Sequence, residues 1–314
     1  MKIVALAGGV GGAKLAHGLA QILPSEDLTI IVNTGDDFEH LGLKVCPDLD
    51  TICYTLAGFA NPETGWGIAN DSWNAINSIE NLGGPGWFRL GDRDLGTHLE
   101  RTRRMMNGQS LSAVTKDFCK AWNVDILVLP MSDDPVPTIV QTNMGDLPFQ
   151  EYFVRRYCEP KVKGFIFRDS EDALPAPGII EAIQEADLLI VCPSNPWVSI
   201  DPILSISSIK ETVLDCKKEN LRVFAVSPII DGRAIKGPVV KMYREMGIEP
   251  SALSVAKHYH NLIDLFVFDL QDQLLREKLQ ELHIDLLCLN TIMKSSNDRK
   301  KLAQEILSKT VTPN

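Results

Sequence analysis

The first fourteen residues, MKIVALAGGVGGAK, constrain the fold more than any other stretch of the chain. Residues 2–7 form a short apolar run with β-branched members, which predicts a buried strand. Glycines follow at positions 8, 9, 11 and 12, and helical apolar spacing begins at Ala13. Such a turn carries unpaired backbone N–H groups and the positive end of a helix dipole, so it is expected to bind phosphate. The candidate phosphate-binding residues are Gly9, Val10, Gly11 and Gly12.

The glycine spacing matches neither standard nucleotide motif. A dinucleotide fingerprint that begins at Gly9 requires a third glycine at position 14, where the chain has Lys14. A Walker A loop requires Gly-Lys-Ser/Thr, but Ala13 and Leu15 flank this lysine. The turn is therefore predicted to hold phosphate in another manner, and a tight strand-to-helix turn without a ligand is the alternative.

Charge and composition exclude several classes of protein. The 314 residues carry a formal net charge of −10, which argues against general binding of nucleic acid or a membrane surface. An acidic protein that binds a diphosphate must also gather local positive charge or a metal ion. No apolar run approaches the ~20 residues of a membrane span, and no signal peptide is expected. The seven cysteines are dispersed, which is typical of reduced thiols in a cytoplasmic protein.

Short apolar runs recur along the chain and alternate with helical patterns, which predicts an α/β fold with a mostly parallel sheet flanked by helices. A smaller inserted lobe is expected around residues 135–175, and six prolines cluster between positions 135 and 177. The pattern of residues 136–154 fits either antiparallel strands or a helix. Residues 99–122 are predicted to form one helix. The further strands are predicted at 28–33, 125–130, 162–167, 187–192, 222–226, 265–270 and 284–289.

Carboxylates gather just after the second predicted strand. Asp36 and Asp37 follow it directly, and ligands of open α/β sheets lie beyond the carboxyl ends of strands. The pair is therefore a candidate for a ribose hydroxyl or a magnesium ion, with a solvated Asx turn as the alternative. Asp48 is a plausible N-cap of the helix that begins at Leu49, and Asp50 falls in the first turn of that helix. Up to four carboxylates are thus expected near one edge of the sheet.

Residues 61–96 are rich in glycine and asparagine and contain Trp66, Trp73 and Trp87. Such a segment makes a poor core of its own but a good wall for a flat aromatic ligand. Arg89 follows the last tryptophan closely, at the start of a charge cluster that ends at residue 94; pairing within this cluster is the alternative to a binding role. Three further arginines, Arg101, Arg103 and Arg104, are predicted on the solvent-exposed face of the next helix.

Two later strand ends carry small polar residues between prolines. The first is Pro193-Ser194-Asn195-Pro196, which suits contact with a base or a phosphate; a proline-stiffened connection is the alternative. The second is the loop of residues 227–238, in which Lys236 is a candidate phosphate contact.

The motifs GGVGGAK, NTGDD, CPDLDT, GWGIANDSWN, WFRLGDRDLGTH, CPSNP and SPIIDGRAIKGP, in this order, resemble the 2-phospho-L-lactate transferase family of coenzyme F420 biosynthesis. The resemblance implies a single Rossmann-like domain over residues 1–314 and a homodimer. It also implies Mg²⁺-dependent transfer of the 2-phospho-L-lactyl group from lactyl-2-diphospho-5′-guanosine to the terminal ribityl hydroxyl of the deazaflavin Fo, giving F420-0 and GMP. Some members use the enolpyruvyl or glyceryl analogue of the donor, and the sequence leaves that choice open.

The resemblance also assigns roles to residues. Asp50 and Arg89 match the deazaflavin-binding positions of the family, with Trp87 as part of the wall. Asp36 matches an acidic position near the metal ion, and Asp48 is a second candidate for this role. Asp50 or Asp48 is the candidate catalytic carboxylate that orients the attacking hydroxyl, and whether it removes the proton stays open. The candidates for the guanosine diphosphate pocket are Gly9, Val10, Gly11, Gly12, Lys14, Ser194, Asn195, Lys236 and Gly237.

Two other classes remain as alternatives. A related family of gluconeogenesis and cell-shape factors has a similar glycine-rich opening, and its members are regulators that bind nucleotide sugars. The tryptophan-rich segment favours the transferase, because a regulator needs no deazaflavin wall. An NAD oxidoreductase is disfavoured because Lys14 replaces the third glycine.

Overall fold

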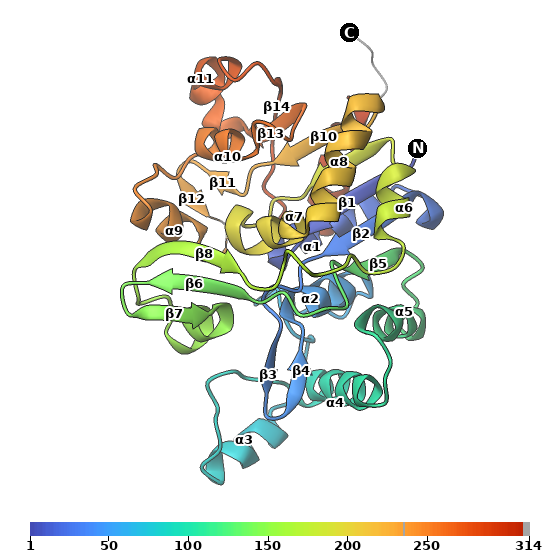
Figure 1. The fold of residues 1–314 in the computed structure, drawn as a ribbon, viewed down its shortest axis with the longest axis vertical. Helices are drawn as coiled ribbons and strands as arrows, with labels where there is room; N and C mark the ends of the chain where they lie inside the picture. Colours follow the sequence, from blue (N-terminus) through green and yellow to red (C-terminus); the bar gives the residue numbers. More distant parts are fainter. Residues whose placement is uncertain (235, 310–314) are drawn as a thin grey trace.

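A seven-stranded sheet lies at the centre of the protein, in a computed structural model that describes residues 1–234 and 236–309 (Figure 1). The strand order is β14–β13–β10–β9–β1–β2–β5, and every pairing in it is parallel. The predicted α/β class is confirmed. The strands are β1 (Ile3–Ala7), β2 (Leu28–Val32), β5 (Leu127–Pro130), β9 (Leu188–Val191), β10 (Arg222–Val226), β13 (Leu265–Asp269) and β14 (Asp285–Leu289).

The sheet is buried on both faces, which explains why its strands are continuous apolar runs. Successive side chains of β1 alternate between two cores: Ile3 and Ala5 pack on one face, and Val4 and Leu6 on the other. One face is covered by α1 (Gly9–Ala20), α2 (Pro47–Leu56), α5 (Leu111–Ala121) and α12 (Ser296–Ser308). The other is covered by α6 (Ile179–Gln184), α7 (Asp201–Ser205), α8 (Ser207–Glu219), α9 (Val239–Glu245), α10 (Ala252–Tyr259) and α11 (Arg276–Gln280).

Two additions extend from the sheet (Figure 1). The first is an antiparallel sheet in the order β7–β6–β8, formed by β6 (Thr138–Thr142), β7 (Gly145–Pro148) and β8 (Val162–Phe167). It falls within the region expected to hold the inserted lobe. A helical turn at Glu151–Arg155 follows β7, so residues 136–154 contain both the strands and the helical structure that the sequence left undecided. The second addition consists of the hairpin β3 (Phe38–His40) and β4 (Leu43–Val45), with α3 (Asn74–Asn81) and α4 (Asp92–Met106).

Three predicted helix boundaries were wrong. The first helix starts at Gly9 and not at Ala13, because tertiary contacts override the low helix propensity of glycine. Residues 99–122 form parts of two helices, since Gly108 (φ +87°) ends the first of them. Pro47 occupies the first helical position of α2, where its fixed φ is favourable, so Cys46 and not Asp48 is the N-cap.

The helices α3 and α4 cap each other. Asp92, the first residue of α4, accepts hydrogen bonds from the backbone N–H groups of Asn74 (3.1 Å) and Ala75 (2.9 Å) in α3. Asp71, just before α3, accepts them from the N–H groups of Arg93 (2.9 Å) and Asp94 (3.0 Å) in α4. Each carboxylate therefore satisfies donors that the other helix leaves unpaired.

The strand order reverses at β1. The chain proceeds from β1 outward to β2 and β5, and then returns to the other side of β1 with β9. Ligands of such sheets bind beyond the carboxyl ends of the strands at this switch point. The glycine turn after β1 and the Pro193–Asn195 turn after β9 meet there, as the sequence predicted. None of the helices in the described part of the chain has the length and apolarity of a membrane span.

The contact between these two turns leaves no room for a side chain. A Cβ atom on Gly11 would lie 2.1 Å from the carbonyl oxygen of Pro193, whereas one on Gly96 in α4 would meet nothing within 4 Å. We predict that Gly11→Ala lowers the free energy of unfolding by about 2 kcal/mol, because the backbone of Pro193 must shift. The matched change Gly96→Ala should raise it by roughly 0.5–1 kcal/mol through helix propensity. Urea denaturation measures both, and equal effects would contradict the close contact.

Candidate active site

A cavity of about 460 Å³ opens at the switch point. Its walls come from the glycine turn, the end of β2, the first turns of α2 and α4, the turn after β9, the loop of residues 227–238 and the segment 149–154 of the β7–β6–β8 lobe. Residue 235 of that loop lies outside the described residues. The cavity thus joins regions that are far apart in the sequence.

The glycine turn is fixed by the turn after β9. Ser194 Oγ accepts a hydrogen bond from the N–H of Gly8 (3.2 Å) and donates one to the carbonyl oxygen of the same residue (2.8 Å). Gly9, Val10 and Gly11 line the cavity, as does Ser194. Gly12 does not line it: a Cβ there would lie 2.5 Å from Ser194 Oγ, so this glycine permits packing below the turn.

Asn195 also lines the cavity, and its side chain has a structural partner. Its Oδ1 accepts a hydrogen bond from the N–H of Trp197 (3.1 Å), which caps the helical turn Pro196–Ile200. The strand-to-helix connection that was the alternative for this turn and the predicted place in the pocket are therefore compatible for Asn195.

Two lysines bring positive charge to the cavity. Lys14 Nζ donates a hydrogen bond to the carbonyl oxygen of Met293 (3.0 Å). Burial, with the nearby charges of Arg299 and Lys236, lowers the pKa of Lys14. Lys236 Nζ donates to the carbonyl oxygens of Glu63 (3.3 Å) and Thr64, so it links two loops across the entrance, and Gly237 lies beside it in the lining. An anion placed between the lysines would offset their mutual repulsion.

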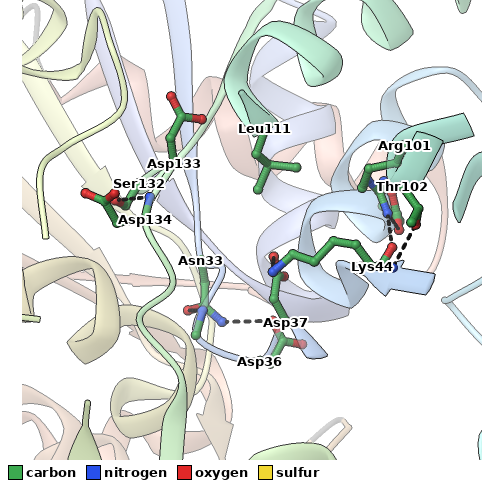
Figure 2. A network of polar contacts seen from close by, with 12 residues as sticks. Asn33, Asp36, Asp37, Lys44, Arg101, Thr102, Leu111, Ser132, Asp133 and Asp134 are labelled. Carbon is green, nitrogen blue, oxygen red and sulfur yellow. Dashed lines mark hydrogen bonds and ion pairs between the residues drawn. The ribbon is translucent and has the colours of Figure 1, made fainter. Parts of the chain in front are cut away.

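Asp36 and Asp48 are held side by side by one amide group. The Nδ2 atom of Asn33 lies 3.3 Å from Asp36 Oδ1 (Figure 2). The same atom donates a hydrogen bond to Asp48 Oδ2 (2.9 Å). Gln150, which the β7–β6–β8 lobe contributes, donates from Nε2 to Asp36 Oδ2 (3.0 Å). Asp37 instead pairs with Lys44 (3.0 Å) outside the cavity lining. Of the four carboxylates expected near this edge of the sheet, Asp36, Asp48 and Asp50 line the cavity, and Asp94 of α4 lines it with them.

The paired carboxylates resist ionisation. Burial raises the pKa of Asp48 to about 6, and burial with the neighbouring Asp48 and Asp37 carboxylates raises the pKa of Asp36 well above its ordinary value. A divalent cation would offset both effects. Mg²⁺ usually takes one or two carboxylates together with phosphate oxygens and water. Among the described residues no three His, Cys, Asp or Glu side chains are placed to hold a metal ion. The pair fits Mg²⁺ that is completed by a phosphorylated ligand.

Asp50 lies in the cavity wall, but its carboxylate has a partner that the sequence analysis missed. Arg101, predicted on the solvent-exposed face, is only 2% exposed and donates two hydrogen bonds to Asp50. That prediction was wrong because an ion pair, which leaves no trace in apolar spacing, determines which way this arginine faces. Arg103 does face solvent, and Arg104 is partly covered by its pairs with Glu100 and Asp117.

The aromatic wall differs in detail from the prediction. Trp66 and Arg89 line the cavity, whereas Trp87 packs behind the lining residue Phe88, with ring centroids 5.8 Å apart. Arg89 donates to Asn77 Oδ1 (3.0 Å) and lies over the ring of Trp73 (5.1 Å). Phe149 and Phe153, which the sequence did not single out, stack at 5.4 Å and also line the cavity.

The fold and the cavity are typical of α/β proteins that bind their ligands at the switch point of a parallel sheet. Within this class, the chain belongs to the family described as 2-phospho-L-lactate transferase CofD, whose family model matches residues 3–307. It is therefore a transferase of a family that acts in coenzyme F420 biosynthesis. The regulatory and oxidoreductase alternatives do not hold.

Relatives with two different names match most of the chain. A phosphoenolpyruvate transferase of Kitasatospora aureofaciens is 44% identical over 280 residues, which are 87% of this chain and 86% of the relative. One of Streptomyces griseus is 42% identical over 278 residues, with the same coverage. A 2-phospho-L-lactate transferase of Methanosarcina acetivorans is 35% identical over 305 residues, 97% of this chain and 98% of the relative. A solved structure from the UPF0052 family of Bacillus halodurans shares the fold, with a TM-score of 0.63, 17% identity and 98% coverage of both chains.

The raised pKa of Asp48 makes the stability of the ligand-free protein depend on pH. The folded state binds this proton more tightly than the unfolded state, so the free energy of unfolding should fall as pH rises from about 4 to 6. We predict that Asp48→Asn removes about 3 kcal/mol of this decrease. Urea denaturation of both proteins at pH 4, 5, 6 and 7 measures it. A difference between the two proteins that does not vary with pH would contradict the assignment.

Proposed function

We propose that this protein catalyses the Mg²⁺-dependent transfer of the 2-phospho-L-lactyl group from lactyl-2-diphospho-5′-guanosine to the terminal ribityl hydroxyl of Fo, giving F420-0 and GMP. The observation that carries the proposal is the meeting, in one cavity, of the glycine turn with two lysines, the Asp36–Asp48 pair, and an aromatic wall with Asp50 and Arg89. These groups suit a diphosphate, a dication and a flat hydroxylated acceptor, respectively.

In this reaction the acceptor oxygen forms a bond to the phosphorus atom that carries the lactyl group, and the bond from that phosphorus to the GMP oxygen breaks. Catalysis of such a transfer rests mainly on positioning and charge neutralisation. The glycine turn, Lys14 and Lys236 would hold the diphosphate, with Ser194, Asn195 and Gly237 beside it. Mg²⁺, held by Asp36 and Asp48, would supply positive charge at the phosphates.

The acceptor hydroxyl needs a group that orients it. Asp50 in the cavity wall is proposed to accept a hydrogen bond from this hydroxyl, and Asp48 is the second candidate for this role. In the loose transition state of such a transfer the hydroxyl keeps its proton until late, so no strong base is required and the proton leaves to water.

The three-carbon acid of the donor has a second candidate. Relatives named phosphoenolpyruvate transferase are 39–44% identical to this chain, whereas those named 2-phospho-L-lactate transferase are 34–35% identical. This difference favours the enolpyruvyl analogue as an alternative donor. The two donors differ by one double bond, so a direct competition between them is required.

The test is GMP release from the lactyl and the enolpyruvyl donors, singly and as an equimolar mixture, with and without Fo and with Mg²⁺ or EDTA. We predict release that requires both Fo and Mg²⁺, with a deazaflavin product whose mass identifies the preferred acid. Preference for the enolpyruvyl donor would replace the lactyl assignment and leave the site unchanged. Release without Fo, or none from either donor, would contradict the proposed transfer.

Asp36→Asn tests the metal role. The variant should need about tenfold or more Mg²⁺ for half-maximal rate, because one carboxylate of the pair is lost. Asp37→Asn is the matched control, since Asp37 pairs with Lys44 outside the cavity lining. GDP binding by calorimetry confirms that each variant is folded. An unchanged Mg²⁺ requirement in a folded Asp36→Asn protein would rule out this ligand.

Arg89→Ala tests the acceptor wall. We predict that Fo binds about tenfold more weakly and GDP within twofold of the wild type, since the guanidinium contributes a cation–π contact and a hydrogen bond at the wall. Arg93→Ala, an exposed arginine of the same segment, is the control. Equal losses for Fo and GDP would indicate collapse of the loop.

The homodimer implied by the family is also a proposal, and analytical ultracentrifugation tests it.

A further inference from the structure

Arg101 is the largest fully buried side chain among the described residues, with 2% of its surface exposed. A buried guanidinium is costly unless its charge and its N–H groups are satisfied. It reaches inward from the middle of α4 toward the backbone of Lys44 (Figure 2). Neither the sequence pattern nor the reaction described above accounts for this arginine.

The partner of Arg101 is Asp50. The Nη1 atom of Arg101 donates to Asp50 Oδ2 (3.0 Å), and Nη2 donates to Asp50 Oδ1. The remaining contacts of Nη1 are the carbonyl oxygen of Lys44 (3.4 Å) and His98 Nδ1 (3.2 Å). This two-pronged pair fixes both the position and the plane of the carboxylate, which a single lysine contact does not do.

The pair leaves Asp50 able to accept a ligand. A carboxylate has about four lone-pair sites on its two oxygens, and a bidentate guanidinium uses one on each. Asp50 forms part of the cavity wall, where an oxygen with a free lone pair can accept a hydrogen bond from a hydroxyl. Arg101 itself does not line the cavity, so it acts on a ligand only through Asp50.

A second layer supports the arginine. Because Arg101 donates to His98 Nδ1, the ring proton of this histidine is on Nε2, which lies 3.2 Å from Asp94 Oδ1. Tyr54 donates its hydroxyl to the same oxygen of Asp94 (2.8 Å). These contacts run from α2 to α4 and back to α2, and they hold Arg101 and His98 beside Asp50.

We propose that Arg101 is a positioning residue of the transfer reaction: it aims the Asp50 carboxylate at the hydroxyl-bearing chain of the acceptor. This inference rests on the proposed function, which supplies the acceptor Fo. A purely structural pair that joins α4 to α2 would stabilise the fold without any effect specific to Fo.

A double-mutant cycle between Arg101→Lys and Asp50→Asn separates the two roles. Lysine keeps the positive charge beside Asp50 but loses the bidentate contact. Arg103→Lys, the same substitution at an exposed position of the same helix, is the matched control. Fo affinity is measured by titration of its fluorescence, GDP affinity by calorimetry, and stability by thermal unfolding.

We expect Arg101→Lys to weaken Fo binding by about tenfold or more and to leave GDP binding within twofold. In the Asp50→Asn background the same substitution should change Fo affinity by less than about threefold, because the group it positions is gone. Arg103→Lys should change neither affinity.

Three results would overturn the proposal: unchanged Fo affinity in Arg101→Lys, parallel loss of Fo and GDP binding, or additive effects in the cycle. If the proposed function itself is wrong, the difference is seen already in the binding measurements on the wild-type protein. A wild-type protein that binds GDP but not Fo would refute the acceptor before any variant is compared.

Discussion

The contact between the turns after β1 and β9 is the constraint on which the site depends. Gly11 approaches the carbonyl oxygen of Pro193 so closely that only a glycine fits, and Ser194 fastens the turn by two hydrogen bonds to Gly8. This contact brings the N-terminus of α1 to the point where the strand order reverses. The other groups of the cavity are arranged around that point, since α2 and the end of β2 both pack beside α1.

The cavity lining contains two groups of like charge: Lys14 with Lys236, and Asp36 with Asp48. Burial and the nearby charges of Arg299 and Lys236 lower the pKa of Lys14, whereas burial and the neighbouring carboxylates raise the pKa of Asp36 and of Asp48. A diphosphate with a dication would relieve both repulsions at once. Asp50 stands apart from this arrangement because its charge is already matched by Arg101. The protein thus has positive charge inside the cavity, where a diphosphate would bind, although its net charge is −10.

The sequence predicted the features that depend on local pattern. Apolar runs located the strands of the central sheet, and their order along the chain placed Asp36, Ser194 and the glycine turn at one edge. Features that depend on tertiary partners were missed or wrong. Arg101 was predicted on the solvent-exposed face of its helix, because helical spacing does not reveal its pair with Asp50. Gln150 and Phe149 were overlooked because a lobe with an undecided structure contributes them to the cavity.

The reciprocal capping by Asp71 and Asp92 has a consequence for the folding of α3 and α4. Each of α3 and α4 starts on a carboxylate that the other segment supplies, so neither helix is complete until both are in place. Short helices are marginal when isolated in water, which makes this mutual dependence strong. The segment that carries Arg89 should therefore unfold as one cooperative unit, and amide hydrogen exchange would report it as a single foldon.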